Sequence, residues 1–111
     1  MPILNCYLTH GNISNESWDQ LVRMWAERIR VDSSDICIHV FTDFRNFGAQ
    51  YQLKVELYLP SIWSQEATET IQNTFLTLVE EVLKIQQDDT FLMTQLIHSG
   101  LVFDRGKQEV W

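Results

Sequence analysis

The sequence has little positive charge. It contains eight lysines and arginines against fifteen aspartates and glutamates, which gives a formal net charge of −7. The basic residues form no run and no stripe, so the composition argues against a nucleic-acid partner. The acidic balance also repels anionic metabolites at long range, and an acidic substrate would need locally placed cations or oriented backbone amides.

Long hydrophobic runs are missing as well. No apolar run approaches the ~20 residues of a membrane span, and the uncharged N-terminal segment shows no signal peptide. We therefore expect a cytoplasmic protein with no membrane partner.

Cysteine is scarce, and no group of residues has the spacing of a metal site. Cys6 and Cys37 lie in apolar, strand-like runs rather than in a CxxC motif, and we expect both to be small buried thiols. His39 and His98 have no second ligand at metal spacing, so both are interpreted as structural histidines. A Gly-rich phosphate loop and a Ser-His-Asp pattern are also missing. We expect neither a metal nor a cofactor.

What is present is an alternation of strand and helix patterns within 111 residues, a length that suits one domain. Alternating or continuous apolar patterns predict strands at 2–8, 36–42, 51–59 and 91–97. Apolar residues at helical spacing, each run preceded by a serine N-cap, predict helices at 15–29 and about 65–87. Trp18 and Trp25 fall at core spacing on the first helix, which is typical of packing rather than of a cofactor site.

The two halves of the chain are similar to each other. Ser14 corresponds to Ser64 and Trp25 to Phe75, each about 50 residues apart. We therefore predict one domain, 1–111, built of pseudo-repeats at about 2–45 and 51–98 and a tail at 99–111. Two β-α-β units with right-handed crossovers give an α+β fold, in which a four-stranded sheet carries both helices on one face.

Such a fold leaves the other face of the sheet bare. The strands at 36–42 and 91–97 are apolar on both sides, which a monomer with an exposed sheet face does not need. We infer that copies of the chain cover this face in an oligomer.

Two motifs resemble the tautomerase superfamily, which includes 4-oxalocrotonate tautomerase and macrophage migration inhibitory factor. One is "MPIL" at the head of the first strand, and the other is "ICIHVFTD" followed by "NFG". The resemblance covers nearly the whole chain in architecture. It implies a homotrimer of duplicated chains, with an N-terminal proline in a pocket at the subunit interface.

The resemblance carries some site residues over and not others. Pro2 matches the catalytic proline, and Phe47 matches an aromatic residue placed over the substrate. The arginine of the turn after the first strand falls at Asn12, and the second-strand arginine falls near Cys37. Val31 replaces the lysine that precedes the second strand in migration inhibitory factor. These departures weigh against the dicarboxylate substrates of the family.

Removal of Met1 would leave Pro2 as a terminal secondary amine. A free α-amino group has a pKa of about 7.7–8.0, so about a tenth to a sixth of it is unprotonated at pH 7. Burial in an apolar pocket or a neighbouring cation lowers that pKa, and a shift of one to two units corresponds to roughly 1.4–2.7 kcal/mol. The amine then suits a general base that moves a proton beside a carbonyl. It could also attack a carbonyl or activate water, so decarboxylation and hydration stay open. A proline that merely begins a strand is the structural alternative.

Three further residues are candidates for substrate binding, each with a plainer alternative. Arg45 could hold a carboxylate bidentately or be a solvated loop residue. The Tyr58 hydroxyl could orient a carbonyl, or the ring could belong to the core or an interface. Arg105 could reach the pocket of a neighbouring subunit or lie on the surface of the tail.

The sequence thus favours a cofactor-independent, homotrimeric tautomerase-like isomerase that acts on a small carbonyl or enol substrate through Pro2. The alternative from another class is a non-catalytic, ferredoxin-like oligomeric binding module, because this sheet topology serves many functions.

Overall fold

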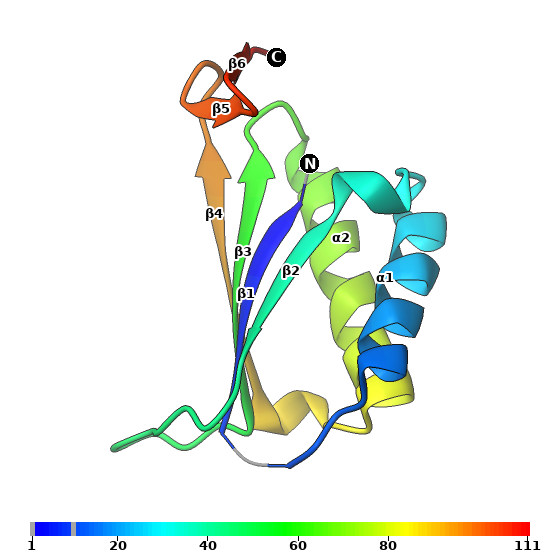
Figure 1. The fold of residues 1–111 in the computed structure, drawn as a ribbon, viewed down its shortest axis with the longest axis vertical. Helices are drawn as coiled ribbons and strands as arrows, with labels where there is room; N and C mark the ends of the chain where they lie inside the picture. The colour runs from blue at the N-terminus through cyan, green and yellow to red at the C-terminus, as the bar shows by residue number, and fades with distance from the viewer. Residues whose placement is uncertain (1, 10) are drawn as a thin grey trace.

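Four strands and two α-helices form the main body of the computed structural model, which describes residues 2–9 and 11–111 (Figure 1). The strands are β1 (Ile3–Leu8), β2 (Cys37–Phe41), β3 (Leu53–Pro60) and β4 (Thr90–Ile97). The helices are α1 (Asn15–Ile29) and α2 (Gln65–Leu78), with short 3₁₀ turns η1 (Ser33–Asp35) and η3 (Gln87–Asp89) before β2 and β4. Within these described residues, no helix is long and apolar enough to cross a membrane.

The sheet has the strand order β2-β1-β3-β4. β1 pairs in parallel with β2 and antiparallel with β3, and β3 pairs in parallel with β4. Each parallel pair is therefore joined through a helix, and both helices cover the same face of the sheet (Figure 1). The predicted α+β fold class is confirmed.

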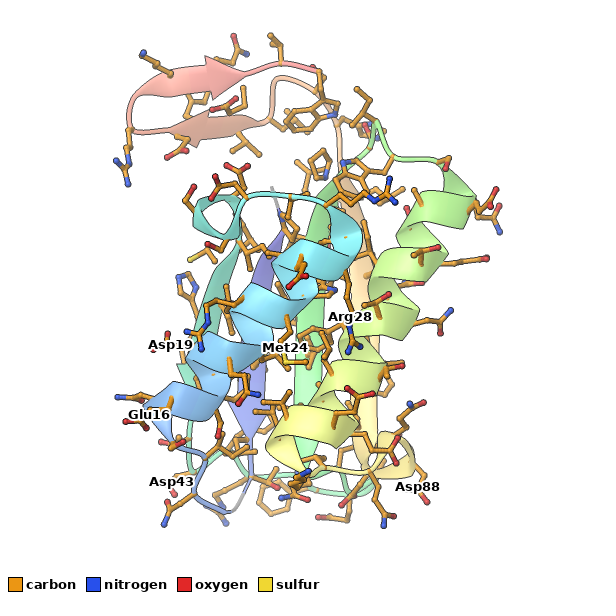
Figure 2. The ribbon with its side chains drawn as sticks, turned by 90° about the vertical axis from the view of Figure 1, so that its right-hand side faces the viewer. Glu16, Asp19, Met24, Arg28, Asp43 and Asp88 are labelled. Carbon is orange, nitrogen blue, oxygen red and sulfur yellow. The ribbon has the colours of Figure 1, made fainter. Side chains whose placement is uncertain are left out.

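Serine caps begin both helices, as predicted. The Ser14 hydroxyl accepts a hydrogen bond from the Ser17 backbone amide, and the Ser64 hydroxyl accepts one from Ala67, each at 3.1 Å. Figure 2 looks onto the helix layer and shows α1 and α2 side by side. Arg28 of α1 pairs there with Glu81 at 3.3 Å, an exposed contact that contributes little to stability.

The second helix is shorter than the sequence predicts. Its α-helical part ends at Leu78 instead of residue 87, and one π-helical turn, η2 (Val79–Leu83), follows. The chain leaves this turn at Lys84, whose φ of 61° lies in the left-handed region. Val79 and Leu83 stay buried all the same. The apolar spacing continues through the change of helix type, which is why the sequence alone extends the helix.

The core lies between the sheet and the helices. β1 alternates as predicted, with Leu4, Cys6 and Leu8 buried on the helix side. Trp25 and Phe75, at equivalent positions of the predicted repeats, meet with ring centroids 4.9 Å apart. The Trp25 indole N–H also donates to the Ile71 carbonyl at 3.2 Å, so its one polar atom is satisfied inside the core.

The opposite face of the sheet, which we call the open face, carries no helix in the part of the chain that the structure describes. It exposes apolar side chains on the outer strands, including Phe41 and Met93, which are 46% and 49% exposed. Its centre is polar, because the pairing register sets Asn5 between His39 and Glu56. The expectation that Cys37 is buried is wrong: Cys37 lies on the outermost strand, faces away from the helices and is exposed.

The tail forms a hairpin of its own instead of extending the main sheet. β5 (Val102–Asp104) and β6 (Lys107–Glu109) pair antiparallel beyond the end of β4 (Figure 1). Arg105 and Gly106 join them with φ values of 52° and 83°, the two positive angles of a type I′ turn. The indole N–H of Trp111 donates to the Ser61 hydroxyl at 3.1 Å, which ties the hairpin to the end of β3.

Replacing Trp25 with phenylalanine should lower the free energy of unfolding by about 1–3 kcal/mol, because the change leaves a void and removes the donor to the Ile71 carbonyl. Urea denaturation at a fixed protein concentration measures this loss. Trp18→Phe is the matched control, since Trp18 is only partly buried, and it should lose less. Equal losses in the two variants would contradict this view of the core.

Candidate active site

Pro2 directly precedes β1, at the end of the sheet where Ile3 and Cys37 line a cavity. Pro2 is buried, and its carbonyl accepts a hydrogen bond from the Cys37 backbone amide at 3.0 Å. The next residue, Ile3, pairs with Cys37 on one side and with Tyr58 on the other. Pro2 is thus held at the start of an inner strand of the sheet. Met1 lies outside the described residues.

The cavity has a volume of about 720 Å³ and is open to solvent. Ile3, Ile36 and Cys37 line it from the sheet side, while Trp63, Arg105 and Trp111 line it from the other side. Its walls therefore combine residues from the two ends of the chain, which lie at the same end of the molecule (Figure 1). The indole rings provide flat apolar surface of the kind that small-ligand sites use.

The charges around this cavity are mostly negative. Asp35, Asp104 and Glu109 contribute carboxylates to its lining, against the single guanidinium of Arg105. Arg105 lies 4.0 Å from Asp104 and its side chain is 95% exposed. Carboxylates stabilise a protonated amine, whereas burial stabilises a neutral one. The fraction of a free Pro2 amine that is neutral thus depends on two opposing effects: burial, which favours the neutral form, and the nearby carboxylates, which favour the protonated form.

Three of the five predicted site residues, Pro2, Tyr58 and Arg105, lie at the same end of the sheet, and Arg105 is the one of them that lines the cavity. Tyr58 is half-buried and pairs with Ile3, so it lies at the Pro2 end, as does Arg105. Arg45 and Phe47 lie in the loop between β2 and β3, at the opposite end of the sheet (Figure 1). The Arg45 guanidinium lies 5.0 Å from the centre of the Phe47 ring, and that ring is 79% exposed. All five residues can share one site only if a second copy supplies the loop.

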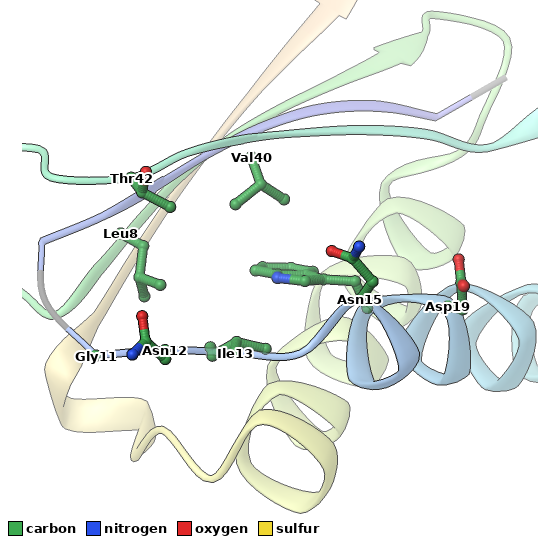
Figure 3. Close-up of a pocket in the computed structure, with 9 residues that line it drawn as sticks. Leu8, Gly11, Asn12, Ile13, Asn15, Asp19, Val40 and Thr42 are labelled. Atoms are coloured by element: carbon green, nitrogen blue, oxygen red, sulfur yellow. The ribbon is translucent and has the colours of Figure 1, made fainter.

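A second hollow lies at the far end of the sheet from Pro2 (Figure 3). It has a volume of about 490 Å³ and lies between the end of β2 and the start of α1, with Leu8, Asn12, Trp18, Val40 and Thr42 among its lining residues. Asn12, where the resemblance places the family's turn arginine, is therefore remote from Pro2 within one chain. Trp18 lines this hollow and also packs against the hydrophobic core.

The sequence reading missed a group of polar residues on the open face. The Tyr7 hydroxyl donates to Glu56 at 2.8 Å, and this hydrogen bond raises the pKa of Tyr7 above its ordinary value. Asn5 and His39 continue the contacts toward Cys37. The alternation of polar and apolar residues within these strands is visible in the sequence, but the pairing of one strand with the next is not.

Comparisons with solved structures give the same fold. No family model and no curated protein matches the chain. Among solved structures, R7 fused 4-OT, described as a wild-type asymmetric trimer, superposes with a TM-score of 0.77 at 18% identity, covering 96% of this chain and 94% of that one. Macrophage migration inhibitory factor from Trichinella spiralis gives a TM-score of 0.77 at 9% identity, covering 96% and 98%. A homologue of that factor from Prochlorococcus marinus gives 0.73 at 13% identity, with the same coverage.

The chain therefore has the same fold as fused 4-OT and macrophage migration inhibitory factor, the fold that the resemblance predicts. The TM-scores establish the arrangement of strands and helices. At identities of 9–18%, they do not transfer an activity to this chain.

Proposed function

We propose that the protein is a cofactor-independent isomerase of the tautomerase superfamily, which moves a proton within a small keto–enol substrate. Removal of Met1 makes Pro2 the terminal amine and the base. The observation that carries the proposal is the position of Pro2, which is buried at the start of β1 next to two residues that line the cavity of about 720 Å³: its neighbour Ile3 and its backbone hydrogen-bond partner Cys37.

The reaction requires a base that is neutral at working pH. Burial of Pro2 disfavours its charged form, and this effect has to exceed that of the three carboxylates in the cavity lining. The neutral amine takes a proton from the carbon or enol oxygen next to the carbonyl, and the resulting ammonium returns it to a different atom. Tyr58, which pairs with Ile3 on the neighbouring strand, is the candidate donor to the developing enolate oxygen.

The lining of the cavity favours substrates with one negative charge at most. Its carboxylates repel a dicarboxylate, whereas Arg105 can bind a single carboxylate. Trp63 and Trp111 offer surface for a flat apolar group. An aryl keto acid such as phenylpyruvate has these features and is the appropriate first substrate.

The active assembly is a homotrimer in this proposal. The open face is partly apolar and unpartnered in a single chain, and one structural neighbour is described as a trimer. Association also explains how Arg45 and Phe47 contribute: the loop of one subunit reaches the Pro2 end of the next, where the exposed Phe47 ring covers the substrate.

Native protein should have the mass of a chain that starts at Pro2, and it should interconvert the keto and enol forms of phenylpyruvate. Pro2→Ala should lower kcat/KM by about 10²–10⁴-fold, the usual range for a general base. One extra residue before Pro2 should abolish activity, because it turns the amine into an amide. A native chain that retains Met1, or an undiminished rate in Pro2→Ala, would refute the role of Pro2 and favour the binding module.

The native protein should sediment as three chains at micromolar concentration. Met93→Glu places a charge on the open face and should shift the protein toward monomer, with loss of tautomerase activity. Asn73→Glu is the matched control, because this residue is exposed on α2 and should leave the trimer intact. A monomeric native protein in analytical ultracentrifugation would exclude the shared site.

A further inference from the structure

Five side chains form a continuous set of contacts across three strands of the open face. Tyr7 donates to Glu56 Oε1 at 2.8 Å, and Asn5 Nδ2 lies 3.4 Å from the same oxygen. Asn5 Oδ1 lies 3.3 Å from His39 Nδ1, and His39 Nε2 lies 3.3 Å from Cys37 Sγ. We call this set the Glu56 network.

The carboxylate of Glu56 determines the direction of these hydrogen bonds. An ionised carboxylate only accepts, so the Asn5 amide must turn its NH₂ toward Glu56 and its oxygen toward His39. That oxygen accepts in turn, and this contact selects the tautomer of the neutral imidazole that carries its proton on Nδ1. Its Nε2 is left with a lone pair facing the Cys37 thiol. The arrangement is a nucleophile, a base and a group that orients the base.

Backbone pairing holds these groups in place. Asn5 is directly opposite both His39 and Glu56 in the sheet register, and Cys37 is two residues from His39 on the same face of β2. The Cys37 amide is itself bonded to the Pro2 carbonyl. The contacts are thus set by strands rather than by loops, which favours a reproducible geometry.

Cys37 is reachable from the substrate cavity at the Pro2 end, the part of the open face that the proposed trimer has to leave accessible, whereas the other cysteine is not. Cys37 is exposed and lines the cavity of about 720 Å³. Cys6 is buried, and burial raises its pKa to about 12. A small electrophile in the cavity therefore has one available sulfur.

We propose that Cys37 is a nucleophile with His39 as its base, and that the pair takes α,β-unsaturated carbonyl compounds. His39 Nε2 accepts the thiol proton as Sγ forms a bond to the β-carbon of the substrate. The π electrons of the carbon–carbon double bond move to form the enolate, and His39 returns the proton to the α-carbon. The sum is addition of S–H across the double bond, with no oxidant or cofactor. The site goes beyond the isomerase activity, since it does not use the Pro2 amine.

N-ethylmaleimide, an α,β-unsaturated carbonyl compound, tests the proposal by intact-mass measurement of the folded protein at pH 7. The expected product has one adduct, on Cys37, and Cys37→Ser should give none; the unfolded chain should give two. Removal of the thiol proton by His39 as the sulfur–carbon bond forms should accelerate the reaction about tenfold. His39→Gln should lose that factor.

Two variants separate a specific relay from a general disturbance. His98→Gln replaces another exposed histidine and should react at the native rate. Asn5→Ala should slow the reaction, and should cause no further loss when combined with His39→Gln, because Asn5 acts through the imidazole. An unchanged rate in His39→Gln, or equal slowing by Asn5→Ala with and without His39, would overturn the proposal. The Asn5→Ala comparison with native protein decides the matter if His39→Gln does not fold. All of these reaction rates can be measured on protein that retains Met1. The test of Cys37 is therefore independent of whether Pro2 acts as a base.

Discussion

The burial of one residue, Pro2, is the constraint on which the rest of this molecule depends. β1 pairs with a strand on each side and packs Leu4, Cys6 and Leu8 against the helices. The residue that precedes this strand is therefore held at one end of the sheet, where its carbonyl accepts a hydrogen bond from the Cys37 amide. A free amine at that point would be partly desolvated while several carboxylates lie around the cavity. Its basicity is the balance of those two effects.

The parallel pairing of β1 and β2 brings two different chemical groups to the same end of the sheet. Pro2 offers a nitrogen and Cys37 a sulfur, and one backbone hydrogen bond joins their residues. The reactivity of each group depends on different features of the structure. Pro2 depends on processing and burial, whereas Cys37 depends on the Glu56 network. The position near which the resemblance places an arginine therefore holds a group of another kind, a nucleophile instead of a cation.

The features of the fold that the sequence could predict are those set by local patterns of apolar and polar residues. The alternation of Leu4 with its neighbours, the cap at Ser14 and the apolar spacing around Trp25 are local signals, and all appear in the structure. The π-helical turn that follows α2 after Leu78 leaves the apolar spacing of that second helix nearly intact. The sequence therefore could not predict the change of helix type.

The site was less predictable than the fold, because it depends on which strands become neighbours. Phe47 is distant from Pro2 within one chain, which only the sheet topology reveals. The exposure of Cys37 and its contact with His39 follow from the outermost position of β2 and from the face that these residues share. A strand pattern gives the alternation of faces but not which face the helices cover.

The most direct test of the central claim is a pH titration of the Pro2 nitrogen by NMR, with ¹⁵N-labelled proline in the native protein. The amide nitrogen of Pro60, the second of two prolines, serves as the internal reference. We expect the Pro2 signal to titrate as a secondary amine with a midpoint below the value of about 7.7–8.0 typical of a chain terminus. A signal that does not titrate, or one with a midpoint at or above that value, would contradict the claim that this protein keeps a neutral amine as its base.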